Sequence, residues 1–179
     1  MHRIVSSITT LAQHIVTMAS SPGTYRLAAC PRCGLGGPWI HGSYQRKVDR
    51  SAAPDQEREV VLVLRFYCRG CGGTHSRLPL CIAPRRWYDW AVQQIVLALT
   101  LTGVSVRAAA RRVDVDRHTA RRWRHWLLAP HALEFVLHLR SQWPELGRLA
   151  DNPSLWRQVL VYPGLAPAMA LVDRQMDVP

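Results

Sequence analysis

Two short cysteine motifs constrain the fold of this chain more than any other feature of its sequence. Residues 30–34 read CPRCG and residues 68–72 read CRGCG, so each motif places two cysteines two residues apart. Zinc prefers four soft ligands in a tetrahedron, and one Cys-x-x-Cys turn supplies two of them. The sequence therefore predicts one structural Zn2+ ion, held by the four cysteines of the motifs: Cys30, Cys33, Cys68 and Cys71.

The residues around the motifs predict a zinc ribbon. Glycine follows the second cysteine of each motif, at Gly34 and Gly72, and its tolerance of positive φ lets backbone N–H groups turn toward the sulfurs. Between the motifs, WIHGSYQRKV and REVVLVLRFYC are rich in β-branched and aromatic residues, and the turn-rich RSAAPDQ separates them. We expect a β-hairpin with one cysteine pair near each end. Four thiolates leave no open position for a catalytic water.

Other uses of these cysteines are a pair of disulfides, a redox Cys-x-x-Cys motif or four buried thiols. A redox motif of the thioredoxin type needs a βαβ setting, which the sequence does not indicate. Iron binds the same four sulfurs, and ligand identity alone does not separate iron from zinc. The fifth cysteine, Cys81, is interpreted as a core residue, and His41 and His75 as polar residues at the surface or beside the site.

From residue 85 the sequence takes on a helical period. Trp87, Ala91, Ile95 and Ala98 are spaced as one face of a helix, and Gly103 is expected to end it. A β-rich module is therefore expected to give way to a helical one.

The stretch VRAAARRVDVDRHTARRWRH, residues 106–125, has the layout of a helix-turn-helix. Ser105 is expected to cap a first short helix, and Asp116 a second one that ends near Leu128. The turn has Asp114 where glycine is usual, and aspartate tolerates the left-handed conformation better than most residues. The small or apolar residues expected at the turn and in the core are Ala110, Val113, Val115, Ala120 and Trp123.

These two short helices are strongly basic. Residues 107–124 hold seven arginines against two aspartates, whereas a solvated helix usually mixes its charges. We therefore expect the second helix to enter the major groove of double-stranded DNA. The expected base-reading residues are Arg117, His118, Arg121, Arg122 and His125. The expected phosphate contacts are Arg107, Arg111, Arg112, Arg85 and Arg86. The alternative is an ordinary helical hairpin with a basic surface.

The charge of the whole chain agrees with a polyanionic partner. Lysine and arginine outnumber the acidic residues 23 to 12, which gives a net charge of +11 and favours nucleic acid first and an anionic membrane second. Lys47 is the one lysine. Arginine suits phosphates and guanine edges, although a GC-rich coding bias explains the same excess. No apolar run reaches the roughly 18 residues of a membrane span, and we expect a cytoplasmic, nucleoid-associated protein.

The two ends of the chain are expected to add helices. An apolar stripe near the N-terminus repeats like one helix face: Ile4, Ile8, Leu11, Ile15 and Met18. It predicts self-association as a homodimer or packing on the same chain, with a secretory signal peptide as a second interpretation. Residues 131–143 are spaced as an amphipathic helix, whereas residues 162–179 contain three prolines and are expected to be loosely ordered.

The predicted fold class is α+β: a small zinc-ribbon β-hairpin module followed by an all-α helix-turn-helix domain, with flanking helices at both ends. The expected segments are an N-terminal helix and linker at 1–25, the zinc ribbon at 26–84, the helix-turn-helix at 85–128, and a C-terminal helix with a loosely ordered tail at 129–179.

Within residues 26–128, the run CPRCG…HGSYQR…RFYCRGCGGTHSRLP, followed by VRAAARRVDVDRHTARRW, resembles the front end of bacterial insertion-sequence transposases. It also resembles short zinc-ribbon/helix-turn-helix proteins that carry Thr-His-x-x-Leu-Pro after the second cysteine pair. The resemblance implies DNA binding to transposon ends or a promoter, with a transposase or another protein as a further partner. Transposase chemistry also needs a ribonuclease-H-like domain with three metal-binding carboxylates. The acidic residues after the helix-turn-helix lie in no β-rich pattern: Glu134, Glu145, Asp151, Asp173 and Asp177.

Three functions remain in view, in descending order. The first is a DNA-binding protein without enzymatic activity, either a transcription regulator or a stand-alone DNA-binding partner of a transposase. The second is a zinc-ribbon module that binds protein and touches nucleic acid only nonspecifically. The third is a nuclease or recombinase, which the sequence disfavours because it lacks a carboxylate cluster.

Overall fold

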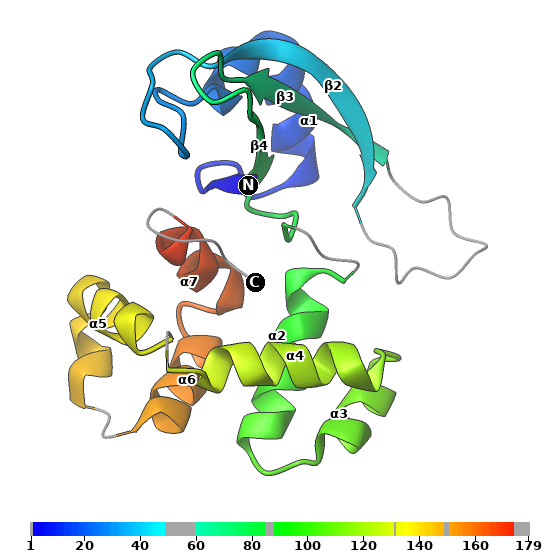
Figure 1. The fold of residues 1–179 in the computed structure, drawn as a ribbon. Coiled ribbons are helices and arrows are strands. Elements are labelled where there is room, and N and C mark those ends of the chain that lie inside the picture. Colours follow the sequence, from blue (N-terminus) through cyan, green and yellow to red (C-terminus); the bar gives the residue numbers. More distant parts are fainter. Residues whose placement is uncertain (1, 49–59, 85–87, 131, 149–150, 174–179) are drawn as a thin grey trace. The chain divides into compact units, whose positions relative to one another are not determined.

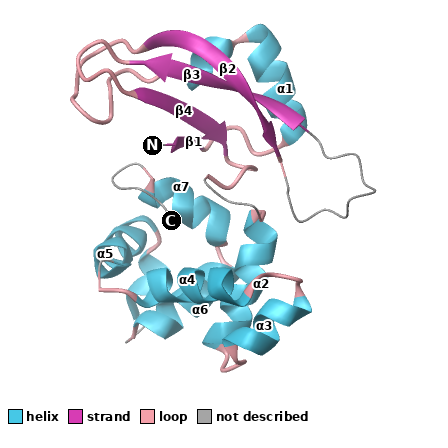
Figure 2. Ribbon diagram, turned by 45° about the vertical axis from the view of Figure 1, so that its right-hand side comes forward, coloured by secondary structure: helices cyan, strands magenta, loops and turns pink. Residues whose placement is uncertain are grey.

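The structure is a computed structural model in which residues 2–48, 60–84, 88–130, 132–148 and 151–173 are described (Figure 1). The chain divides into two compact units, Met1–Trp87 and Tyr88–Pro179. The first unit contains the sheet and the second is helical, which confirms the predicted α+β fold class (Figure 2). None of the described helices is both long and apolar enough to cross a membrane.

The first unit is built on a four-stranded mixed sheet with the order β1-β4-β3-β2. β1 runs parallel to β4, whereas β3 pairs antiparallel with both β2 and β4. The predicted hairpin is present as β2 and β3, and β4 continues from it. The strand bounds are β1 His2–Val5, β2 Trp39–Lys47, β3 Val60–Tyr67 and β4 Thr74–Pro79.

The apolar stripe near the N-terminus does not form one helix face, as the sequence analysis expected. Residues His2–Val5 form β1, because Ile4 and Val5 pair with the end of β4, and the helix α1 begins only at Leu11 and ends at Ser20. Thr10 caps it in a capping box with Gln13. A short 3-10 helix, η1 (Pro22–Tyr25), follows.

Two small apolar clusters form the core of the first unit. One contains Val5, Ile8, Tyr25 and Phe66, with Met18 and Leu64 packed against it. The other contains Val61, Val63, Leu78 and Ile82, with partners that include Leu11, Tyr44 and Cys81. Cys81 is therefore packed at the edge of the core, as expected.

A buried histidine ties α1 to the sheet. The His14 Nε2 atom lies 3.1 Å from the carbonyl oxygen of Leu62, and its Nδ1 atom lies 2.6 Å from the Tyr25 hydroxyl. Because a carbonyl only accepts, Nε2 carries the proton and Nδ1 accepts from Tyr25. Burial lowers the pKa of His14, opposed by its bond to Leu62, and burial raises the pKa of Tyr25 to about 12. The neutral imidazole is thus the form that the fold favours.

The second unit packs a series of helices around large apolar side chains. Trp156, Leu139 and Met169 are among its fully buried residues. The bounds are α2 Trp90–Leu101, α3 Val106–Arg112, α4 Arg117–Leu128, α5 Ala132–Gln142, η2 Pro144–Arg148, α6 Asn152–Val161 and α7 Leu165–Val172.

The buried face of α2 differs from the expected one. Asp89 caps the helix, and Ala91 and Ile95 are exposed, whereas Gln93 and Thr100 are buried. Both buried polar side chains bond to backbone oxygens of neighbouring turns, at 3.2 Å and 3.0 Å. Polar residues on the core face therefore concealed it from the sequence pattern, and Trp87 lies outside the described residues.

The expectation of a loosely ordered tail is wrong for residues 165–172. These residues form α7, and the Leu165 backbone N–H donates to the Gln94 side chain on α2 at 2.8 Å. The helix is apolar on nearly every side because most of its residues are buried, so it lacks the amphipathic period that marks a surface helix.

Candidate metal centre and basic helix

The two cysteine motifs fold into the same tight turn. In the first turn, the Cys30 backbone N–H donates to the Leu35 carbonyl at 2.8 Å, and Gly34 donates to the Cys30 carbonyl at 2.9 Å. The second turn repeats both bonds at the equivalent positions, each at 2.9 Å. Gly34 and Gly72 have φ of 74° and 66°, which confirms the predicted positive φ at both glycines.

The strand pairing of the hairpin brings the two turns together. The first turn precedes β2, and the second joins β3 to β4, while Trp39 at the start of β2 is paired with Tyr67 at the end of β3. Cys30 and Cys68 are buried, Cys33 is exposed and Cys71 is half-buried. The cluster is therefore closed toward the sheet and open toward solvent.

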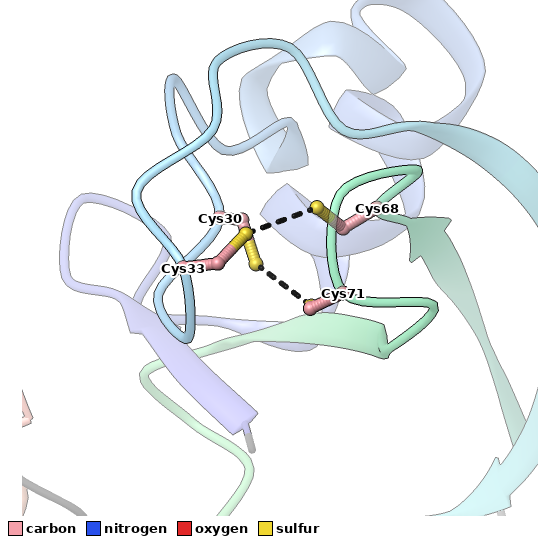
Figure 3. Close-up of side chains that lie close together, drawn as sticks. All are labelled: Cys30, Cys33, Cys68 and Cys71. Carbon is pink, nitrogen blue, oxygen red and sulfur yellow. Dashed lines mark hydrogen bonds between the residues drawn. The ribbon is translucent and has the colours of Figure 1, made fainter.

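The four sulfurs have the spacing of a tetrahedral metal site (Figure 3). All four Sγ atoms lie within 4.8 Å of one another. The Cys30–Cys71 pair is separated by 3.7 Å and the Cys33–Cys68 pair by 3.5 Å. A tetrahedron with Zn–S bonds of about 2.3 Å has edges of about 3.8 Å. The cysteines are free thiols, so the cluster fits one metal ion and is not a pair of disulfides.

Polar groups around Cys30 favour its thiolate. The His75 Nε2 atom, on β4, lies 3.2 Å from the Cys30 Sγ atom, and the Arg32 backbone N–H donates to the same sulfur at 3.4 Å. Burial raises the pKa of Cys30, but donation from the backbone of Arg32 and Cys33 and from neighbouring thiols lowers it to about 6 overall. His75 thus lies beside the site, as expected, whereas His41 is exposed.

The exposed member of the cluster behaves in the opposite way. The Leu35 N–H lowers the pKa of Cys33, but sharing with the other three thiols, together with desolvation, raises it to about 11. The thiols alone thus favour a proton at Cys33 and a thiolate at Cys30. A bound divalent cation favours thiolate at every ligand, which couples metal binding to proton release.

The turn between α3 and α4 forms as its sequence predicts. Ser105 caps α3 by accepting from the Ala108 N–H at 3.2 Å, and Asp114 has a φ of 51°. Asp116 caps α4 by accepting from two backbone N–H groups, at 2.9 Å and 3.0 Å, and these bonds lower its pKa. The residues on the core side of this pair are buried except for Val113, which is half-buried: Ala110, Val115, Ala120 and Trp123.

All five predicted base-reading residues are exposed on α4. The buried face of α4, formed by Ala120, Trp123 and Leu127, lies against the core, which leaves the basic residues toward solvent: Arg117, His118, Arg121, Arg122 and His125. On α3, Arg107, Arg111 and Arg112 are also exposed. Arg85 and Arg86 lie outside the described residues.

The basic side chains of α4 fall into two rows. One row lines a surface hollow of about 520 Å3 that has an apolar floor: Arg117, Arg121, Arg124 and His125. Beside this row, Arg122 donates to the Thr119 hydroxyl at 3.0 Å. The sequence analysis left Arg124 out of the candidate set, although its spacing of seven residues from Arg117 places it on the same face.

These observations define the chain as an α+β protein with a four-cysteine candidate metal centre followed by a helical unit. Residues 30–123 match the family described as a domain of unknown function, DUF6431. The match spans more than half of the 179 residues, and the chain therefore belongs to the DUF6431 family. The matched region begins at the first cysteine of the cluster and ends within α4. Comparisons with curated proteins and with solved structures gave no significant match.

Proposed function

We propose that this chain is a DNA-binding protein in which one structural zinc ion holds the cysteine cluster and α3 and α4 act as a helix-turn-helix. The observation that carries the proposal is the face of α4. Its twelve residues include six exposed basic side chains and no acidic one, while the opposite face is buried. Such a face suits the dense negative charge of a duplex.

The geometry of the helix pair suggests how the contacts divide. Arg117 and Arg121 lie on the first turns of α4, the part of a recognition helix that reaches base edges. An arginine there donates to O6 and N7 of one guanine. Arg111 lies on α3, the helix that crosses the backbone, where contacts hold phosphates without reading sequence. We therefore assign base reading to α4 and phosphate contacts to α3.

The zinc ion has a structural role in this proposal. The two turns supply all four ligands, and the sulfur spacing fits Zn–S geometry. Zinc rather than iron, and the absence of catalysis, stay predictions. The resemblance to transposase front ends further supports a regulator or a stand-alone DNA-binding subunit. A homodimer on a two-fold site, a transposase or another protein as partner, and a place at the nucleoid belong to the same proposal.

A comparison of two arginine variants tests the proposed function. The best duplex is first selected from random DNA with the full protein, and binding is then measured on that duplex and on a scrambled one across a salt series. Arg121→Ala should lose about 1–3 kcal/mol on the selected duplex and flatten its preference at one or two base pairs. Arg111→Ala should weaken both duplexes alike and reduce the salt slope by about one ion.

The matched control is Arg157→Ala, which removes the same charge from an exposed site on α6, where Arg157 donates to the Ser154 hydroxyl. This variant should bind both duplexes nearly as the parent does. Equal losses for Arg121→Ala and Arg111→Ala on both duplexes would mean that α4 is only a basic surface. The protein-interaction module with nonspecific nucleic-acid binding would then replace the proposal.

A further inference from the structure

A group of exposed rings lies on the hairpin beside the cysteine cluster. Trp39 and His41 on β2 and Tyr67 on β3 lie together, with ring centroids 6.1 Å apart for Trp39–Tyr67 and 5.4 Å apart for His41–Tyr67. The Arg69 guanidinium lies over the Trp39 ring at 5.0 Å. We call these four residues, Trp39, His41, Tyr67 and Arg69, the aromatic platform.

The platform is exposed to an extent that core packing does not explain. Trp39 is 45 % exposed and His41 is exposed as well, and neither belongs to the two apolar clusters of the sheet. A hollow of about 210 Å3 adjoins the platform, lined by Trp39, Arg69 and the 35–38 segment among others. A large ring half in water is the arrangement of a surface that meets a planar ligand.

The local backbone presents these rings. The register of β2 and β3 shifts between Ile40 and Ser43, and Gly42 has a φ of 114° there. Such a bulge re-aims the side chains next to it. A second arginine–ring pair continues along the same two strands, where Arg65 lies over Tyr44 at 5.4 Å. Rings and guanidinium groups thus alternate on one part of the hairpin.

The charge around the platform selects a polyanion. Residues 2–48 and 60–84 contain eight arginine and lysine residues and no aspartate or glutamate. A duplex keeps its bases stacked on each other, whereas a single strand offers the flat face of each base to a ring and its phosphates to arginine. The combination of half-exposed rings with an acid-free basic surface therefore fits unpaired nucleotides better than a duplex.

We propose that the aromatic platform binds single-stranded DNA by stacking bases on Trp39 while Arg69 contacts the phosphate backbone. The choice of DNA rests on the proposed function, but the stacking surface lies in the first unit and α4 lies in the second. A chain with both surfaces engages a duplex and an adjacent unpaired strand. The two activities are therefore separable by mutation.

The experiment measures binding of the full, zinc-loaded protein to fluorescein-labelled oligo-dT of 12 nucleotides by anisotropy. Trp39→Leu keeps an apolar side chain but removes the ring, and it should weaken binding about tenfold or more, whereas Trp39→Phe should keep most of the affinity. Arg69→Ala should weaken binding and reduce the salt slope by about 0.7. Ile40→Ala is the matched control, because Ile40 is an adjacent, similarly exposed residue without a ring.

Zinc content and binding to the selected duplex are measured for every variant. The proposal predicts that Trp39→Leu retains zinc and duplex affinity, while Arg121→Ala retains oligo-dT affinity. It is overturned if the parent does not bind oligo-dT, or if Trp39→Leu binds it as the parent does. It is also overturned if Trp39→Phe or Ile40→Ala loses as much affinity as Trp39→Leu, or if Trp39→Leu loses zinc, which would make the ring a shield for the metal centre. Loss of duplex binding alone would contradict only the function proposed for α4.

Discussion

The two units differ in what holds each of them together. The first has two small apolar clusters on its sheet and gathers four sulfurs within 4.8 Å at one end of the hairpin. The second buries larger side chains, among them Trp156, Leu155 and Leu127, with no cysteine in its sequence. A small sheet with a modest core needs a cross-link, whereas packed helices do not. The comparison predicts that metal removal and core mutation act on different units.

The largest expected effect is that of losing the metal. Structural zinc contributes an apparent binding free energy of about 10–16 kcal/mol to small domains, so Cys68→Ser should unfold the first unit. The helices of the second should keep most of their circular dichroism. Elemental analysis should find one zinc ion in the parent and none in Cys68→Ser. The matched control is Cys81→Ser, the same change at a half-buried cysteine outside the cluster, which should retain zinc. A metal-free parent, or zinc retained in Cys68→Ser, would contradict the prediction.

A core mutation in the second unit should do the reverse. Trp156 is fully buried and lies near Trp126, with ring centroids 6.5 Å apart. Trp156→Ala should lower the free energy of unfolding of the second unit by about 3–5 kcal/mol because it leaves a cavity. Urea unfolding measures this loss, and zinc content should stay at one ion. Arg157→Ala, at the next and exposed position, should change stability little. Release of zinc by Trp156→Ala would show that the units depend on each other.

A smaller effect is expected at the cap of α3. The Ser105 hydroxyl accepts from the Ala108 N–H, and removing such a cap costs about 1 kcal/mol. Ser105→Ala should lower the stability of the second unit by this amount, and Ser105→Asp should restore it. The control is Ser141→Ala on α5, whose hydroxyl bonds only within its own helix. Equal stability of Ser105→Ala and the parent would mean that the cap contributes nothing.

The smallest expected effect is acid sensitivity of the first unit through His14. Burial lowers the pKa of His14 below the 6.5 of an exposed histidine, so the unfolded chain takes up the proton first. The stabilisation is therefore complete above pH 6.5 and falls as the pH drops below it. One proton changes the free energy of unfolding by less than about 1.4 kcal/mol per pH unit.

Thermal unfolding at pH 7 and pH 6 measures this acid sensitivity, with zinc content checked at both values. His14→Gln should unfold at temperatures that differ less between the two pH values than those of the parent. The exposed His41 supplies the control, because His41→Gln should leave the parent's difference unchanged. A parent that is no less stable at pH 6 would contradict the assignment of a neutral, buried His14.

The sequence predicted the features whose causes are local. The two glycine-containing cysteine turns, the caps at Ser105 and Asp116, and the left-handed Asp114 all depend on neighbours a few residues away, and each is present. The hairpin followed from strings of β-branched residues. At the candidate site, the sequence predicted the four cysteines that the structure brings together and the exposed basic face of α4.

The features that the sequence did not predict depend on distant contacts. β4 carries the buried polar residues His75 and Ser76, so its sequence lacks the alternation of a strand, and β1 exists only through its pairing with β4. Helix α7 is too apolar to show a period. The aromatic platform arises from residues on two strands and a bulge. Only the register of β2 and β3 places these rings together.

The matching hydrogen bonds of the two cysteine turns also bear on how a metal ion is captured. Each turn is closed by its own backbone bonds, so each is a preformed bidentate chelator, and the hairpin is the tether between them. Once one turn holds the ion, the second binds intramolecularly at an effective concentration that the tether sets. Affinity for the metal therefore depends on the pairing of β2 with β3 as well as on the sulfurs. A substitution such as Val63→Ala, in the sheet core, should weaken zinc binding by lowering that effective concentration, with every ligand intact.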